Sequence, residues 1–222
     1  MTPWLAEIGE AEVLEILLEE ASAEHALRII LPRLVPGAVE HVNFELRVFS
    51  GKDDLLRKLP SRLRGYTAWS EGSNVRILTL VDRDDEDCVE LKRRIDKMAG
   101  SAGLRIHRSG DLISGGIFKS RIACEEIEAW YLGDPAALRK VYPRVAKNFE
   151  HRKGFRDVDA IKGGTWEKLE KLLQDAGYFA NGLRKLEIAR SLAPVMDLEV
   201  NSSSSFRHFC NAVRDIFPMS TI

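Results

Sequence analysis

The sequence predicts an α/β protein with a mainly parallel sheet flanked by helices. Short apolar runs of strand length alternate with stretches in which apolar residues recur every three or four positions. Strands that alternate with amphipathic helices are typical of a parallel sheet covered on both faces. Several of the apolar runs also end in carboxylates. At 222 residues the chain can form one large domain, or a domain with an appended subdomain.

The composition is that of a folded soluble protein, with 45% hydrophobic and 30% charged residues. The net charge of −1 gives no overall basic signature for nucleic acid, but the charge is unevenly distributed. Residues 1–36 hold seven Asp and Glu against two Arg, whereas residues 139–190 hold thirteen Lys and Arg against seven Asp and Glu. The basic part could bind a polyanion, and ordinary salt-bridged helix surface is the alternative.

The three cysteines, Cys88, Cys124 and Cys210, show no CxxC spacing, so we expect neither a zinc site nor a disulfide framework. Cys88 and Cys124 are expected to be small core residues in a reducing compartment. No run approaches the ~20 apolar residues of a membrane helix. The acidic N-terminal stretch does not resemble a signal peptide. We therefore expect a cytoplasmic protein without membrane contacts.

The first predicted unit is a strand over Glu12–Leu18 followed by a helix. Ser22 is a suitable N-cap for this helix, and apolar residues recur at helical spacing after it. Pro32 is expected to kink the helix or end it early. The carboxylates that follow this strand are Glu19, Glu20 and Glu24.

The second predicted unit is an alternating strand over Val42–Phe49 and a helix that begins near Asp53. Pro60 is expected to break the helix because proline lacks the backbone N–H that the helix interior needs. Helical structure is then expected to resume over Arg62–Trp69.

The third predicted strand, Val75–Val81, is a continuous apolar run of the kind found in the middle of a sheet. The segment that follows it has five carboxylates in six residues, with Arg83 among them. A helix with apolar residues at intervals of three and four then runs from Cys88 to Gly100. The acidic segment is either a cation site or a solvated loop that precedes the helix. Its carboxylates are Asp82, Asp84, Asp85, Glu86 and Asp87.

Two more strands are predicted, over Leu104–His107 and Ile117–Cys124, and the second runs into Glu125, Glu126 and Glu128. Three strands therefore deliver carboxylates to one edge of the predicted sheet, where ligands of parallel α/β proteins bind. Such carboxylates repel each other strongly unless a cation offsets them. Hard oxygen ligands suit Mg²⁺ or Mn²⁺. The pattern predicts a metal site, with an idle acidic rim as the alternative.

The rest of the chain predicts helices and a long loop. Asp134 should cap a helix, and residues 143–160 are polar and weakly periodic, as in a long or mobile loop. The Gly-rich turn at residues 162–166 precedes a helix and could hold a phosphate, although it lacks P-loop spacing. A plain turn with an N-cap is the alternative. Leu183–Ala193 is a further predicted helix, and Ser205 should cap the last one.

These features suggest two parts, an α/β domain of residues 1–134 and a basic helical subdomain of residues 135–222 packed on it. The strand that ends in Glu and the later strand that ends in Asp-x-Asp resemble the Toprim domain of topoisomerases, primases and nucleases of the OLD family. The chain more specifically resembles a Toprim-like family of uncharacterised bacterial proteins. The matching segments, which span nearly all of residues 12–210, are LLEEASAEHALRIILPRL, FSGKDDLLRKLPSRLRGY, LVDRDDEDC, RIACEEIEAWYLGD, IKGGTWEKLEKLL and GLRKLEIARSLAP.

The resemblance implies that Glu20 is the Toprim glutamate, with its neighbour Glu19 as the alternative. The OLD-type pattern Glu-Gly-x-Ser/Thr-Glu is matched by residues 20–24 except that Ala21 replaces the glycine. The choice between the two glutamates therefore stays open. Asp82 and Asp84 match the Asp-x-Asp pair, and Asp87 belongs to the DxDxxDC signature of the more specific family.

The resemblance further implies a Mg- or Mn-dependent nuclease or related phosphoryl-transfer enzyme that acts on nucleic acid in a bacterial defence system. The alternative is a non-catalytic Toprim-like module that partners an ATPase. Expected catalytic residues are Glu20, Asp82 and Asp84; expected metal ligands are Glu20, Glu24, Asp82, Asp84, Asp87 and Glu128; expected nucleic-acid contacts are Lys162, Arg184, Lys185 and Arg190.

Overall fold

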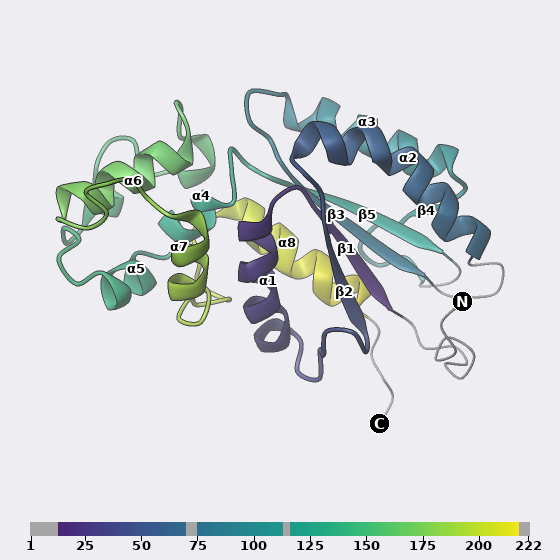
Figure 1. The fold of residues 1–222 in the computed structure, drawn as a ribbon, viewed down its shortest axis with the longest axis horizontal. Helices are drawn as coiled ribbons and strands as arrows, with labels where there is room; N and C mark the ends of the chain where they lie inside the picture. The colour runs from purple at the N-terminus through teal and green to yellow at the C-terminus, as the bar shows by residue number, and fades with distance from the viewer. Residues whose placement is uncertain (1–12, 70–74, 113–115, 218–222) are drawn as a thin grey trace.

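The computed structural model describes residues 13–69, 75–112 and 116–217. In that part of the chain five strands form one all-parallel sheet in the order β2-β1-β3-β5-β4 (Figure 1). Helices flank the sheet, so the predicted α/β class is confirmed, and the architecture is consistent with a Toprim-like fold. The strands are β1 (Leu14–Leu18), β2 (Phe44–Val48), β3 (Arg76–Asp82), β4 (Arg105–Ile106) and β5 (Ile117–Ala123).

Two pairs of helices cover the two faces of the sheet. One pair is α1 (Ala21–Leu34) with α8 (Ser204–Ile216), and the other is α2 (Lys52–Trp69) with α3 (Cys88–Ser101). The remaining helices lie beside the sheet, at the left in Figure 1. These are α4 (Glu128–Leu132), α5 (Pro135–Val141), α6 (Thr165–Asp175) and α7 (Lys185–Leu192).

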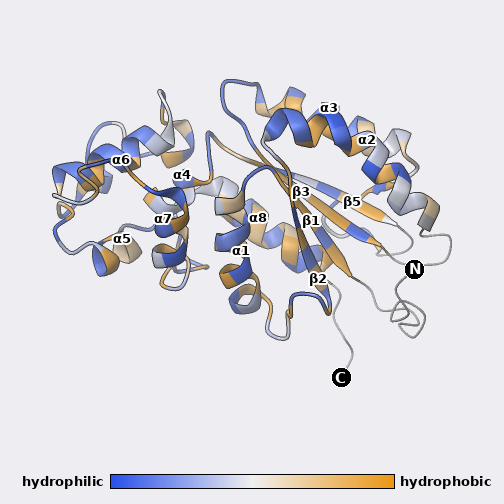
Figure 2. Cartoon of the chain, in the orientation of Figure 1, coloured by the Kyte–Doolittle hydropathy of each residue, from blue (hydrophilic) through white to orange (hydrophobic). Residues whose placement is uncertain are grey.

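Residues of one strand alternate between the two faces, as the pleat of a β-strand requires. In β1, Ile16 and Leu18 belong to the core on the α1 and α8 side, while Leu17 belongs to the core on the α2 and α3 side. Figure 2 shows hydrophobic residues concentrated in the strands, whereas the helices mix hydrophobic and hydrophilic residues. Because both faces are covered, the central strands β1 and β3 are nearly continuous apolar runs.

The first unit differs from its prediction at its start and at its helix cap. The strand begins at Leu14, and the predicted first residue, Glu12, lies outside the described residues. The residue at the N-cap of α1 is Glu20, and Ser22 lies within the first turn. The Ser22 hydroxyl donates a hydrogen bond to the Glu20 carboxylate, so its predicted capping role is wrong.

Neither proline breaks its helix, contrary to expectation. Pro32 lies inside α1, and Pro60 lies inside α2, which continues to Trp69. Loss of one helical hydrogen bond at proline costs about 3 kcal/mol. In α2 the buried Leu59 and Leu63 lie on either side of Pro60, and each buried leucine contributes roughly 1.5–3 kcal/mol. Packing on the sheet therefore outweighs the local cost.

The C-terminal helices share a core with the sheet. The last helix, α8, packs on β5, and buried residues of α4 to α8 belong to the same apolar cluster as β1 and β3. The N-cap of α8 is Ser203 rather than the predicted Ser205. The boundary predicted at residue 134 stays a prediction. Within the described residues, no helix has the length and apolar character that crossing a membrane requires.

The predicted loop over residues 143–160 contains two short 3-10 helices, Phe149–His151 and Val158–Ala160. Three apolar side chains of the segment are buried in the core, Val145, Phe149 and Val158, at 3%, 0% and 4% exposure. The segment therefore packs on the rest of the molecule. Only Val145 and Phe149 are at helical spacing, so the sequence gives no sustained periodic signal.

Candidate functional site

Carboxylates from three strand ends meet at the carboxyl edge of the sheet. Glu19 directly follows β1, Asp82 is the last residue of β3, and Glu128 opens α4 after β5. Asp82 and Glu128 are buried, at 7% and 1% exposure. Glu19 and Asp82 share a side-chain hydrogen bond, and Asp82 also experiences the charges of Glu128 and Glu20. We call Glu19, Glu20, Asp82 and Glu128 the acidic cluster.

Burial and mutual repulsion disfavour the charged forms of Glu19, Asp82 and Glu128. Burial raises the pKa of Glu19 to about 7, and the nearby carboxylates of Asp84 and Glu20 add to this effect. The pKa of Asp82 lies well above its ordinary value because its carboxyl group is buried and faces Glu19 and Glu128. Burial likewise raises the pKa of Glu128 to about 7. The acidic cluster is therefore electrostatically unfavourable in its fully ionised form.

Hydrogen-bonding capacity at the acidic cluster is incomplete. Glu19 Oε2, Glu128 Oε2 and the hydroxyl of Tyr131 are buried without a hydrogen-bond partner. A buried polar atom without a partner costs roughly 1–3 kcal/mol, and buried polar groups are normally satisfied. The fold therefore holds oxygen atoms at this edge that a bound cation or a polar ligand could satisfy.

Lys185, at the start of α7, forms ion pairs with carboxylates of the acidic cluster. Its Nζ lies 3.3 Å from Glu20 Oε2, 3.6 Å from Glu128 Oε1 and 3.9 Å from Glu126 Oε1. Burial alone would lower the pKa of Lys185, but the surrounding carboxylates, led by Glu128 and Glu20, raise it above its ordinary value. Lys185 also lies over the Trp166 ring, 5.3 Å from its centroid. Lys185, which the sequence predicted as a nucleic-acid contact, therefore pairs with the acidic cluster.

A cavity of about 510 Å³ lies along α7. Its lining includes three of the four predicted nucleic-acid contacts, Arg184, Lys185 and Arg190. The other lining residues are Leu186, Glu187 and Ser191. Lys185 therefore touches the acidic cluster on one side and this cationic cavity on the other.

The Gly-rich turn before α6 is a capped turn. Gly163 and Gly164 have φ values of 83° and 85°, which explains the two glycines. The Glu126 carboxylate accepts hydrogen bonds from Thr165 Oγ1 at 3.1 Å and from the backbone N–H of Trp166 at 2.8 Å. Glu126 therefore occupies the position at the helix N-terminus that a phosphate would take. Lys162, the fourth predicted nucleic-acid contact, lies in this turn.

Three predicted metal ligands have other partners. Glu24 pairs with Arg28 on the next turn of α1, at 2.8 Å. Asp84 is half-exposed and pairs with Lys52 at 3.1 Å. Asp87 is the N-cap of α3, and its Oδ1 accepts hydrogen bonds from two backbone N–H groups. The carboxylate that caps this helix is therefore Asp87.

Glu86 instead pairs with Lys52 and Arg94, at 2.8 Å and 2.9 Å. Sequence reasoning missed Lys52, which also donates to the carbonyl of Arg83 at 2.9 Å. The signal was its position directly after Gly51, at the carboxyl end of β2. Burial lowers the pKa of Lys52, but its bonds to Glu86 and Asp84 outweigh this and raise it.

The residues of the acidic cluster fit a hard divalent cation by their chemistry. They supply carboxylate oxygens, and two of those oxygens are buried without partners. As the side chains stand, the described residues contain no group of three or more His, Cys, Asp or Glu placed to hold a metal ion. Metal binding would therefore require these side chains to rotate. The best-placed ligands are Glu19, Asp82 and Glu128.

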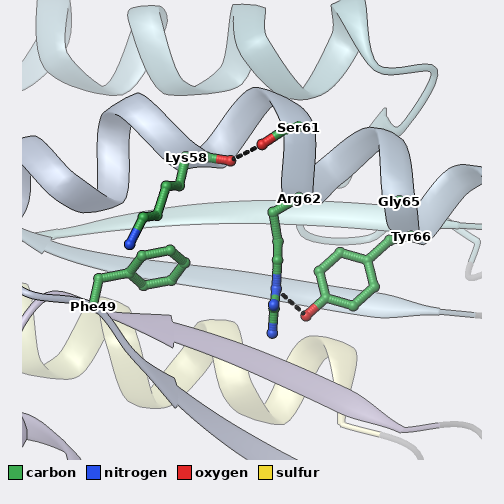
Figure 3. Close-up of a pocket in the computed structure, with 6 residues that line it drawn as sticks. All are labelled: Phe49, Lys58, Ser61, Arg62, Gly65 and Tyr66. Carbon is green, nitrogen blue, oxygen red and sulfur yellow. Dashed lines mark hydrogen bonds between the residues drawn. The ribbon is translucent and has the colours of Figure 1, made fainter.

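A second cavity, of about 500 Å³, lies between α2 and the end of β2 (Figure 3). Phe49, Lys58, Arg62 and Tyr66 contribute to its lining. The Arg62 Nε donates to the Tyr66 hydroxyl, which in turn donates to the buried carboxylate of Glu15. None of the residues that line this cavity is a predicted site residue.

The fold and site define an α/β protein with a parallel sheet and an acidic cluster at the carboxyl edge. The chain belongs to the family described as a domain of unknown function, DUF4276, which matches residues 7–214. Neither the curated proteins nor the solved structures contain a match to the chain.

Proposed function

We propose that this protein is a metal-dependent nuclease or a related phosphoryl-transfer enzyme that acts on nucleic acid. The observation that carries the proposal is the position of Lys185. Its ammonium group pairs with the half-buried Glu20 and the buried Glu128, and Lys185 also lines the cationic cavity at α7. Phosphodiester chemistry needs acidic groups for a metal and basic groups for the phosphate backbone. The resemblance of the sequence to Toprim domains supports the same activity.

In this proposal Glu19, Asp82 and Glu128 hold Mg²⁺ or Mn²⁺, and Glu19 takes the Toprim role first expected of Glu20. The metal would polarise the phosphate and lower the pKa of an attacking water. Glu20 holds Lys185 in place through their ion pair. Arg184 and Arg190 would bind backbone phosphates on either side of the reacting one. A cytoplasmic location and a role in bacterial defence belong to the same proposal.

A second candidate function is a non-catalytic module that binds a partner, such as an ATPase. One observation favours it. Lys185 and Lys52 already pair with acidic side chains at this edge, and the described side chains do not form a ready metal-binding set. The carboxylates would then serve as a surface for basic residues of the partner.

Incubation of the purified chain with plasmid, single-stranded DNA and tRNA distinguishes the two candidates. Each substrate is tested with Mg²⁺, Mn²⁺ and EDTA. The nuclease proposal expects metal-dependent cleavage that is lost in Asp82→Asn and Glu19→Gln. Glu90→Gln is a matched control, because this carboxylate is 63% exposed on α3 and pairs with Arg93. Cleavage that persists in Asp82→Asn would contradict the proposed site.

Absence of cleavage in every metal, combined with co-purification of an ATPase, would favour the binding module. In that case Asp82→Asn should weaken the complex while Glu90→Gln leaves it intact. If cleavage occurs only after the ATPase is added, the chain is the catalytic subunit of a larger enzyme.

A further inference from the structure

The sulfur atoms of two cysteines, Cys88 and Cys124, lie in contact. Cys88 is the first residue of α3, and Cys124 directly follows β5. Their sulfur atoms are 3.8 Å apart, and both are free thiols. Neither is fully buried, in contrast to Cys210 in α8, which is 1% exposed. The expectation that Cys88 and Cys124 are core residues is therefore wrong, because solvent reaches both.

The backbone around the two cysteines is fixed by hydrogen bonds. The N–H of Arg83 donates to the carbonyl of Ala123 at 2.9 Å, and the N–H of Asp84 donates to the carbonyl of Glu125 at 3.1 Å. On the α3 side, Asp87 caps the helix that Cys88 opens. The two sulfurs are thus held near each other by the fold. A disulfide has a sulfur–sulfur length of about 2.0 Å, so the two sulfurs, now 3.8 Å apart, must move closer to form one.

We propose that Cys88 and Cys124 are a reversible oxidation site that forms an intramolecular disulfide with a peroxide as the oxidant. This inference goes beyond the proposed function and does not depend on it. The Cys88 sulfur attacks a peroxide oxygen, the O–O bond breaks, and a sulfenic acid forms with release of water. The Cys124 sulfur then attacks the Cys88 sulfur, the S–O bond breaks, and hydroxide leaves with the Cys124 proton as water. One peroxide is reduced to two waters, and two thiols are oxidised.

In the order proposed here, Cys88 at the start of α3 meets the oxidant and Cys124 resolves the sulfenic acid. The reverse order consumes the same peroxide and gives the same disulfide. The disulfide would tie the start of α3 to the segment that carries Glu125 and Glu128.

The test treats the purified full chain with hydrogen peroxide and then counts free thiols in denaturant. The chain has three cysteines, so formation of one disulfide leaves one free thiol. Mass spectrometry of a non-reduced digest should find the Cys88 and Cys124 peptides linked, with the loss of two hydrogens. Dithiothreitol should restore all three thiols. The oxidised chain should run as a monomer on a non-reducing gel.

Three single variants make the result specific. Cys210→Ser should still form the linked peptide pair, whereas Cys88→Ser and Cys124→Ser should not. Circular dichroism spectra that match the unmodified chain would show that these variants are folded. The inference is overturned if peroxide leaves Cys88 and Cys124 unlinked, converts either to sulfinic acid alone, or links either of them to Cys210 or to a second chain.

Discussion

At the residue scale, the main electrostatic feature of the acidic cluster is the pair of hydrogen-bonded carboxyl groups of Glu19 and Asp82. Both have raised pKa values because they are buried among like charges. A fold that keeps such groups together pays a stability cost unless they bind something. These groups lie at the carboxyl edge of a parallel sheet, where ligands of α/β proteins bind, and this position supports the proposed site.

The first prediction concerns the pH dependence of metal-free protein. The pKa of Glu19 is raised from 4.5 to about 7, so between these pH values the folded protein keeps a proton that the unfolded chain releases. The free energy of unfolding therefore falls as pH rises through this window. In urea titrations with EDTA, Glu19→Gln should gain on the order of 1–2 kcal/mol relative to the unmodified protein between pH 5 and pH 8. If the difference in unfolding free energy between the two proteins were the same at pH 5 and pH 8, the burial of the Glu19 carboxyl group would be contradicted.

Sequence reasoning at this scale expected Asp82 and Glu128 at the same edge of the sheet, where the structure places them close together, but it could not choose between Glu19 and Glu20. A short motif with one mismatched residue does not fix which of two adjacent side chains faces the site. The structure shows that the first residue after β1, Glu19, faces Asp82, while Glu20 turns to Lys185. The position of Lys52 after the turn was visible in the sequence, but the sequence does not show which distant carboxylates this lysine pairs with.

At the scale of single elements, the start of α3 allows a test of whether Asp87 is a helix cap or a metal ligand. Asp87 accepts hydrogen bonds from the backbone N–H groups of Val89 and Glu90, both at 2.9 Å. Replacement of an N-cap by alanine typically costs about 1 kcal/mol. Asp87→Ala should therefore lose about that much stability in chemical denaturation, whereas Asp87→Asn should retain it. If Asp87→Asn abolished metal binding, Asp87 would be a ligand as well as a cap.

The attachment of α8 to the sheet gives a second prediction for an element. Lys119 of β5 is 3% exposed and pairs with Asp215 of α8 at 2.6 Å. Removal of one partner from a buried pair leaves an uncompensated charge and costs about 3 kcal/mol. Asp215→Asn should show this loss in urea denaturation, while Asp175→Asn, in an exposed pair with Lys171, should cost less than about 0.5 kcal/mol.

The double variant Lys119→Met with Asp215→Leu should recover most of the loss, because it removes both charges. Equal effects of Asp215→Asn and Asp175→Asn would mean that α8 is held by its apolar face alone.

Strands and helices were predicted well where the spacing of apolar residues determines them, and poorly where tertiary packing determines them. The five strands and most helices were visible as apolar patterns, whereas the helical continuity across Pro60 was not. Local rules count the missing hydrogen bond at proline, but they do not count the burial of Leu59 and Leu63 on the sheet. The N-cap of α8 differed for a similar reason, since several nearby serines could each serve locally.

At the scale of the whole molecule, the parallel sheet explains why distant acidic residues meet. Three different strands end at or just before Glu19, Asp82 and Glu128. Because the strands are parallel, all three ends lie at one edge of the sheet. The helices beside the sheet add Lys185 and the cationic cavity. Acidic residues from the first part of the chain and Lys185 from the basic part therefore lie in contact, although they are far apart in the sequence. The sequence could predict the acidic edge but not that Lys185 would lie within it.

Calorimetric titration of Mn²⁺ into the purified chain and into Asp82→Asn tests the central claim most directly. Asp82 is the buried member of the cluster that faces both Glu19 and Glu128. The account predicts that the unmodified chain binds Mn²⁺ and that Asp82→Asn weakens the affinity by more than about tenfold, or roughly 1.4 kcal/mol. Glu90→Gln should bind like the unmodified chain. No binding by the unmodified chain, or equal binding by Asp82→Asn, would contradict a metal site at the acidic cluster.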